Sequence, residues 1–151
     1  MSRFIQWFND SRGESILVRA AITHVFFESI HPFEDGNGRI GRALVEKALS
    51  QSLGHPTLVA VSQGIIRRKK EYYEALGFCN RTLEINAWIQ FFSEVILQSQ
   101  EESVSLIRFL AEKSRLMSEL KGQLNERQEK VLLRMFAEGL KGFSGGLNAE
   151  N

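Results

Sequence analysis

Residues 15–30 read SILVRAAITHVFFESI. A helix built from this stretch carries apolar residues on most of its faces, which is typical of a central, buried helix rather than of a surface helix. Pro32 disfavours helical geometry at the residue before it, so we expect the helix to end at His31. The sequence therefore predicts a fold organised around one buried helix.

Further helical patterns follow. We expect a second helix over about 38–53, which Gly54 caps and Pro56 stops. Ser62 is expected to cap a third helix, whose sequence QGIIRRKKEYYEALGF follows directly. Both segments lack the period-two alternation of a strand.

The rest of the chain has the same character. Apolar residues at three- and four-residue spacing predict a fourth helix over 85–96 and a fifth over 101–121. Asn125 is expected to be the N-cap of a sixth helix, ERQEKVLLRMFAEG. No alternating run of convincing length occurs, so the predicted fold class is all-α.

The composition limits the classes of function that the chain can have. The 151-residue chain is 43% hydrophobic and 25% charged, and its formal net charge is +1, so no bulk electrostatic attraction to nucleic acid or to a membrane is expected. Cys79 is the single cysteine, which suits a reducing compartment, and we expect it to be buried. The N-terminus MSRFIQWFND has no apolar run of signal or membrane length. We therefore predict a cytoplasmic protein.

Residues 31–42, between the first two predicted helices, read HPFEDGNGRIGR. Gly36 and Gly38 can take positive φ angles and allow the backbone to approach a ligand closely. Successive backbone N–H groups in such a turn can form a concave nest for an anion. The next helix begins here, so its unpaired N–H groups and positive dipole end point to the same place.

Two arginines strengthen the case for a phosphate ligand. Arg39 and Arg42 lie three residues apart at the start of that helix, and hence on one face. Cations there oppose the helix dipole by about 0.3–1 kcal/mol each unless an anion compensates. Because guanidinium groups bind phosphate oxygens in a bidentate manner, the pair suits a ligand with several phosphates.

Asp35 and His31 add chemistry at the two lips of the turn. A carboxylate is the kind of hard oxygen ligand that holds Mg²⁺ together with substrate phosphates. Histidine is the side chain that most often acts as a general base at neutral pH. A plain loop between helices also favours Asp, Gly and Asn for reasons of turn geometry. From the residues alone, a phosphate site and an ordinary turn both remain open.

The segment 31–42 resembles the signature of the Fic family, HPFx(D/E)GNGRxxR. All the fixed positions are matched: His31, Pro32, Phe33, Asp35, Gly36, Asn37, Gly38, Arg39 and Arg42. The stretches RAAITHVFFESIHPF and SQGIIRRKKEYYEAL extend the resemblance over roughly residues 3–97. It implies a helical bundle in which the motif forms the loop between two central helices.

Most Fic proteins with the full motif are protein adenylyltransferases, which transfer AMP from ATP to a hydroxyl group of a target protein and release pyrophosphate. The resemblance implies that His31 takes the proton from the Ser, Thr or Tyr hydroxyl of the target. It implies that Asp35 holds Mg²⁺, that residues 36–38 form the anion nest, and that Arg39 and Arg42 hold the β- and γ-phosphates. ATP and Mg²⁺ are thus the expected substrate and cofactor.

Three more residues are implied on weaker grounds. The run YYEALGFCN resembles a family element that lines the base and ribose of the nucleotide, which makes Tyr72, Tyr73 and Asn80 candidate nucleotide-binding residues. Tyrosines on a helix also commonly pack in the core, so that alternative stays open. Phe33 is expected to be a buried anchor for the loop.

The resemblance also suggests a domain division. We expect a Fic core over 1–117 that lacks the family's N-terminal helices and β-hairpin flap, a linker over 118–125, and the partial start of a winged-helix-like domain over 126–151. No inhibitory (S/T)xxxE(G/N) motif is found, and DNA binding by this chain is not predicted. Apolar surface left by missing helices would favour homo-oligomers.

Other functions stay open at this point. One alternative is a Fic fragment that binds a nucleotide or assembles with other chains without catalysis. Another is a Fic enzyme that transfers a different phosphate-containing group. A third is a helical domain whose loop binds nothing.

Overall fold

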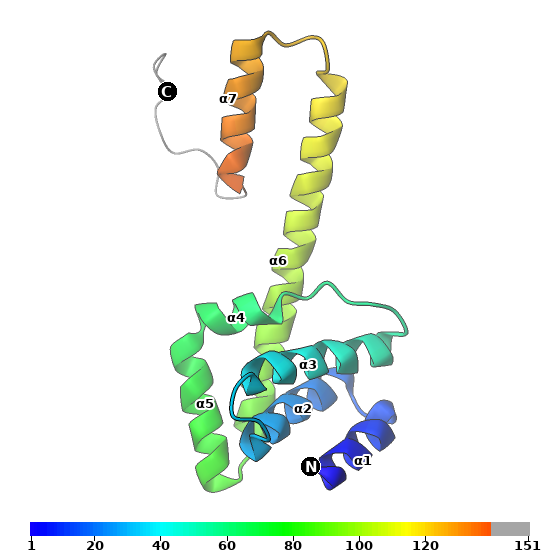
Figure 1. Cartoon of the computed structure of the whole chain (residues 1–151), viewed down its shortest axis with the longest axis vertical. Helices are drawn as coiled ribbons and strands as arrows, with labels where there is room; N and C mark the ends of the chain where they lie inside the picture. The colour runs from blue at the N-terminus through cyan, green and yellow to red at the C-terminus, as the bar shows by residue number, and fades with distance from the viewer. Residues whose placement is uncertain (140–151) are drawn as a thin grey trace. The chain divides into compact units, whose positions relative to one another are not determined.

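The computed structural model describes residues 1–139 and is all-α over this range, as predicted. Its helices are α1 (Ser2–Asp10), the 3₁₀ helix η1 (Ser11–Gly13), α2 (Ile16–Ile30), α3 (Asn37–Leu53), α4 (Val61–Arg67), α5 (Lys69–Thr82), α6 (Asn86–Glu119) and α7 (Glu126–Ala137) (Figure 1). They form two compact units, Met1–Glu101 and Glu102–Asn151. Each unit is described by itself.

The central pair of the first unit is α2 and α3, which lie side by side (Figure 1). Helix α2 ends at Ile30, and His31 follows in the left-handed conformation with φ 46°. Helix α3 ends at Leu53, and Gly54 caps it with φ 75°. Both predicted helix ends are therefore confirmed. Together the two ends place the segment 31–36 as a short connection at one end of the pair.

The main core forms where α6 meets α2. Trp88 and Phe92 are buried, and their rings stack on the imidazole of His24 at centroid distances of 5.9 and 4.8 Å. The Trp88 indole Nε1 donates a hydrogen bond of 2.8 Å to the carbonyl of Ala21. This polar link satisfies the indole N–H inside an otherwise apolar contact.

A buried arginine joins α1, η1, α2 and α3. The guanidinium of Arg19 donates to the carbonyl oxygens of Phe8 (2.9 Å) and Ala48 (3.0 Å) and to Ser11 Oγ (3.2 Å). It also lies 4.7 Å from the centroid of the Phe8 ring. A small apolar cluster packs beside it and consists of Phe4, Phe8, Phe27 and Ala48.

The third predicted helix is wrong in two details. It begins at Val61 with Ala60 as N-cap instead of Ser62, and it is divided at Arg68 into α4 and α5. Arg68 has a non-helical backbone, with φ −109° and ψ 33°. Its guanidinium bonds Glu71 and Glu94 and lies 4.7 Å from the Phe91 ring centroid. The break thus coincides with tertiary contacts to α6, which local sequence does not reveal.

The predicted fourth and fifth helices are one helix, α6. The residues between them, 97–100, read LQSQ and contain neither glycine nor proline. Nothing in the local sequence therefore stops the helix between the two predicted segments. Among the described residues, none of the helices combines the length and the apolar character of a membrane span.

In the second unit, the predicted N-cap of α7 is confirmed. Asn125 Oδ1 accepts from the Gln128 backbone N–H at 2.9 Å, and Gln128 Oε1 accepts from the Asn125 N–H at 3.0 Å, which completes a capping box. The predicted linker, 118–125, covers the end of α6 and the turn before α7. The division at 117 and 126 stays a prediction, and residues 140–151 lie outside the described part.

Candidate phosphate-binding site

The motif loop is bounded by two residues in the left-handed conformation. His31 has φ 46° at the end of α2, and Gly36 has φ 86° as the N-cap of α3. Glycine is favoured at position 36 because a side chain there would be strained. Gly38 does not have a positive φ, so the expectation of backbone freedom is confirmed for Gly36 and is wrong for Gly38. A Cβ at position 38 would lie 3.2 Å from Arg42 Nη1, so the guanidinium would have to move slightly for a side chain to fit there.

The side chain of Asn37 closes the loop. Asn37 is buried, its Oδ1 accepts from the Phe33 backbone N–H at 3.0 Å, and its Nδ2 donates to the Phe33 carbonyl at 2.5 Å. Because one amide satisfies both backbone groups of Phe33, the loop keeps one shape. The backbone N–H groups of the first residues of α3 are those that helix geometry leaves without an intrahelical partner.

Phe33 itself is not a buried anchor, so that expectation is wrong. Its side chain is 47% exposed, and its ring contacts the buried Phe27 ring at a centroid distance of 6.4 Å. The physical reason is that the loop is held through the Phe33 backbone, by Asn37, rather than through the Phe33 side chain.

The charged residues of the motif are divided between two places. His31, Asp35 and Arg39 are exposed, and Arg39 Nη2 donates to Asp35 Oδ2 at 2.8 Å. With side chains 73% and 91% exposed, this ion pair contributes little stability and opens readily. Arg42 is half-buried and lies beside Gly38, toward α2.

The three weaker candidates occupy different environments on α5. Tyr72 is buried, and its hydroxyl lies 3.1 Å from His24 Nε2. Tyr73 is 60% exposed. Asn80 is exposed and accepts a hydrogen bond of 2.7 Å from Ser29 Oγ, two residues before His31. Asn80 therefore lies close to the start of the loop, and the roles of all three residues stay predictions.

Sequence reasoning missed Glu28, which lies behind the loop on α2. Its Oε1 is shielded from solvent and has no hydrogen-bond partner among the described residues. Burial raises the pKa of the Glu28 carboxyl, and the positive charges of His31 and Arg42 oppose that rise. The sequence pattern that could have identified Glu28 is its spacing. It follows His24 by four residues and precedes His31 by three, which places the three residues on one face of a helix.

His24 faces the same region from the core. Burial lowers its pKa to about 4, and the positive charge of Arg42 acts in the same direction. The imidazole is therefore neutral at neutral pH. This agrees with the structural role that its place on the central helix suggests.

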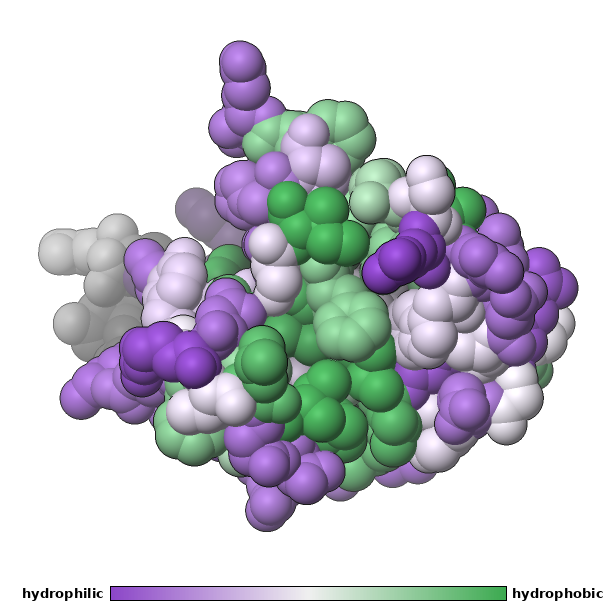
Figure 2. Space-filling view, turned by 90° about the horizontal axis from the view of Figure 1, so that it is seen from below, coloured by the Kyte–Doolittle hydropathy of each residue, from purple (hydrophilic) through white to green (hydrophobic). Residues whose placement is uncertain are grey.

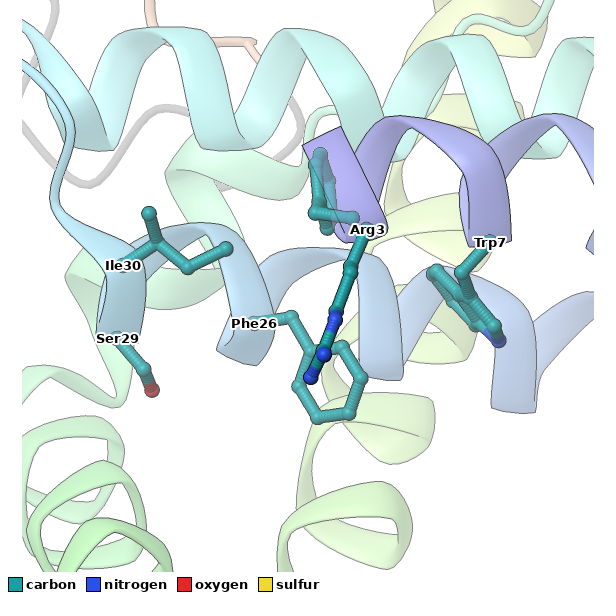
Figure 3. Close-up of a pocket in the computed structure, with 6 residues that line it drawn as sticks. Arg3, Trp7, Phe26, Ser29 and Ile30 are labelled. Carbon is teal, nitrogen blue, oxygen red and sulfur yellow. The ribbon is translucent and has the colours of Figure 1, made fainter. Parts of the chain in front are cut away.

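A shallow hollow of about 450 Å³ lies between α1 and α2, next to the end of α2. The side chain of Arg3 extends from α1 toward Phe26 on α2 (Figure 3). The other lining residues are Phe4, Trp7, Ser29 and Ile30. Figure 2 shows hydrophobic side chains gathered on one face of the molecule. The hollow is mainly apolar, so its chemistry does not match a polyphosphate.

Asp35 fits the role of a Mg²⁺ ligand only together with a phosphate-bearing molecule. The described residues hold no group of three or more His, Cys, Asp or Glu side chains arranged for a metal. Mg²⁺ commonly binds one or two carboxylates and completes its shell with substrate phosphates and water. A single exposed carboxylate at the lip of the loop fits that mode of binding.

Comparison with known proteins finds one matching family model. The model of the Fic/DOC family matches residues 1–49, which extend from α1 through most of α3 and include the loop. The resemblance to the Fic family that the motif carries is confirmed over these residues.

Three similar proteins share one name. The chain is 31% identical over 96 residues to the protein adenylyltransferases Fic of Drosophila mojavensis and Drosophila grimshawi, and 30% identical over 96 residues to that of Drosophila melanogaster. The matched region is 62% of this chain and 18%, 19% and 18% of the three relatives. The chain thus spans about a fifth of the length of the curated relatives it matches.

Proposed function

We propose that this chain carries the catalytic loop of a protein adenylyltransferase. The reaction transfers AMP from ATP to a hydroxyl group of a target protein and releases pyrophosphate. The observation that carries the proposal is the loop 31–42, which is fixed by Asn37 and opens onto the N-terminus of α3. The name of the curated relatives agrees with it.

The loop is suited to bind phosphates before any ligand arrives. Gly36 turns the chain so that α3 begins directly after the loop, and no acidic residue occupies the first turn of α3. The unpaired N–H groups and the positive end of the helix dipole therefore act together on an anion. A preformed set of donors stabilises charge without reorganisation during the reaction.

The charged side chains supply the remaining contacts. Arg39 leaves its exposed ion pair with Asp35 at little cost and binds phosphate, while Asp35 becomes free to hold Mg²⁺. Bound Mg²⁺ would neutralise charge on the phosphates as pyrophosphate leaves. Arg42, half-buried behind Gly38, provides the second guanidinium.

His31 is placed for the proton transfer. It is exposed at the edge of the loop, so a side chain of another protein can reach it. The target hydroxyl oxygen forms a bond to the α-phosphorus, the bond from this phosphorus to the bridging oxygen breaks, and His31 accepts the hydroxyl proton. The substrate is thus a Ser, Thr or Tyr side chain of a target protein, and we place the reaction in the cytoplasm.

Label transfer tests the reaction. The chain is incubated with α-labelled ATP, Mg²⁺ and candidate target proteins. We expect labelled protein with the unmodified chain, none with His31→Ala, and undiminished label with His55→Ala, which removes an exposed histidine outside the motif. Equal labelling by the unmodified chain and His31→Ala would contradict the assigned role of His31.

Calorimetry with ATP and Mg²⁺ tests the site separately from the reaction. We expect Arg42→Ala to weaken binding by about tenfold or more, since a charge-assisted hydrogen bond contributes about 1.5–3 kcal/mol. Lys47→Ala, which removes an exposed cation from the same helix, should leave binding unchanged. Binding without label transfer would instead support a non-catalytic nucleotide-binding module, and no binding would overturn the site.

A further inference from the structure

We propose that Glu28 is a positioning residue, whose partly buried carboxylate orients the Arg42 guanidinium toward the phosphates of the bound nucleotide. This inference rests on the proposed function, because it assigns Arg42 to the phosphates. It adds a residue outside the 31–42 motif to the site.

Gly41 of α3 makes room for the Glu28 carboxylate. A Cβ at position 41 would lie 2.6 Å from Glu28 Oε1, which is closer than real Cβ atoms approach another atom. A Cβ at position 38 would lie 3.9 Å from the same oxygen and 3.2 Å from Arg42 Nη1. The carboxylate and the guanidinium thus border the same side of Gly38.

The oxygen that faces this space lacks a partner among the described residues. A buried acceptor without a hydrogen bond costs free energy, so such atoms in folded proteins commonly have a role in a site. The guanidinium of Arg42, a cation beside Gly38, is able to donate both to this oxygen and to a phosphate. A guanidinium that a fixed carboxylate already holds loses less conformational freedom when a phosphate binds. The entropic cost of phosphate binding is therefore lower.

The charged and titratable groups that act on Glu28 come from three helices. His24 lies on α2 and is neutral, and His31 follows α2 at the edge of the loop. Arg42 lies on α3. Tyr72 lies on α5, where burial raises the pKa of its hydroxyl and the charge of Glu28 adds to the rise. Of these groups, Arg42 is the permanent cation, so it is the natural partner of the carboxylate.

A titration without any ligand tests the pairing. The carboxyl carbon signal of Glu28, assigned by its loss in Glu28→Gln, is followed against pH by nuclear magnetic resonance. We expect the pKa of Glu28 to rise further in Arg42→Gln, because the opposing positive charge is gone, and to stay unchanged in Lys47→Gln. An unchanged Glu28 titration in Arg42→Gln would overturn the proposal.

Binding of ATP with Mg²⁺ tests the orienting role. Glu28→Gln removes a negative charge next to an anion site, so electrostatics alone would strengthen binding. Loss of a positioning residue would instead weaken binding, and we expect the affinity for ATP to fall by about threefold to tenfold. Glu14→Gln, which removes an exposed carboxylate from another part of the unit, should leave binding unchanged. Stronger binding by Glu28→Gln would overturn the proposal.

A double-mutant cycle shows whether Glu28 acts through Arg42. If it does, Glu28→Gln should have no further effect on ATP affinity in a chain that already carries Arg42→Gln. An equal effect in both backgrounds would contradict the inference. If the unmodified chain binds no ATP, the proposed function fails, whereas an unchanged Glu28 titration defeats the pairing with Arg42 even when ATP binds.

Discussion

At the scale of single residues, Arg19 shows how a cation can be buried without an anion. Its side chain is fully buried, and each of its hydrogen-bond partners in the described part is a neutral oxygen. The planar guanidinium distributes its donors over three elements, α1, η1 and α3, which an ammonium group cannot do in the same geometry. The stability of α1 against the central pair therefore depends on the shape of this group as well as on its charge.

Replacement of Arg19 by lysine keeps the charge and removes that shape. We expect Arg19→Lys to lower the free energy of unfolding by about 2 kcal/mol or more, because the carbonyls of Phe8 and Ala48 lose their donors inside the protein. Urea unfolding measures the difference. Arg12→Lys, at an exposed position, is the matched control and should be nearly neutral. Equal stability of the two variants would show that the fork geometry is unimportant.

At the scale of elements, the contact of α2 with α3 is set by Gly41. A methyl group there would meet Glu28 Oε1 at 2.6 Å and His24 Nδ1 at 3.3 Å. The two helices can approach this closely only while position 41 has no side chain. The same contact places the motif loop relative to the core.

We expect Gly41→Ala to destabilise the protein by about 1–3 kcal/mol, the usual cost of overpacking. The gain in helix propensity from alanine, about 1 kcal/mol, acts in the opposite direction and is smaller than a severe clash. Gly13→Ala is a suitable control, because nothing lies within 4 Å of a Cβ at that position. Thermal unfolding of both variants decides the matter, and a Gly41→Ala chain as stable as Gly13→Ala would contradict this packing.

The elements also show how far the sequence predicts the structure. The ends of α2 and α3 and the cap of α7 follow from local signals, namely Pro32, Gly54 and Asn125, and these were predicted correctly. The break at Arg68 was not, because the contacts that its guanidinium makes with α6 are tertiary and do not show in the local sequence.

The candidate site divides in the same way. The motif names the residues of the loop, and the resemblance that it carries is confirmed for residues 1–49. Sequence patterns do not show that Asn37 bonds the backbone of Phe33 or that Phe33 stays exposed. They also do not identify Glu28 as a site residue, because its burial depends on how α2 packs on α3.

At the scale of the whole molecule, stability depends on pH through His24. Burial lowers the pKa of this imidazole to about 4, whereas in the unfolded chain it titrates near 6.5. Between these values the unfolded chain binds a proton that the folded protein does not. Stability is therefore fully present above pH 6.5 and is lost as the pH falls toward 4, by about 3 kcal/mol in total. The raised pKa of Glu28 acts in the opposite direction at acidic pH.

Urea unfolding at several pH values between 7 and 4 measures this loss. We expect His24→Gln to have a smaller change of unfolding free energy over this range than the unmodified chain, whatever its absolute stability. His55→Gln should keep the original dependence, because His55 is exposed. An imidazole titration of His24 near 6.5 in the folded protein would contradict the argument.

The clamp made by Asn37 has a consequence for how the protein ages. Asn37 is followed by Gly38, and Asn-Gly is the sequence in which the next backbone nitrogen attacks the asparagine side-chain carbonyl most readily. Ammonia leaves, and water opens the cyclic imide to give aspartate or isoaspartate. Such a conversion would exchange the Nδ2 donor for a carboxylate oxygen facing the Phe33 carbonyl, so attraction would become repulsion. While the clamp is closed, its two hydrogen bonds hold the amide in place. A purified sample stored warm at alkaline pH should therefore gain one mass unit at position 37 more slowly when folded than when denatured.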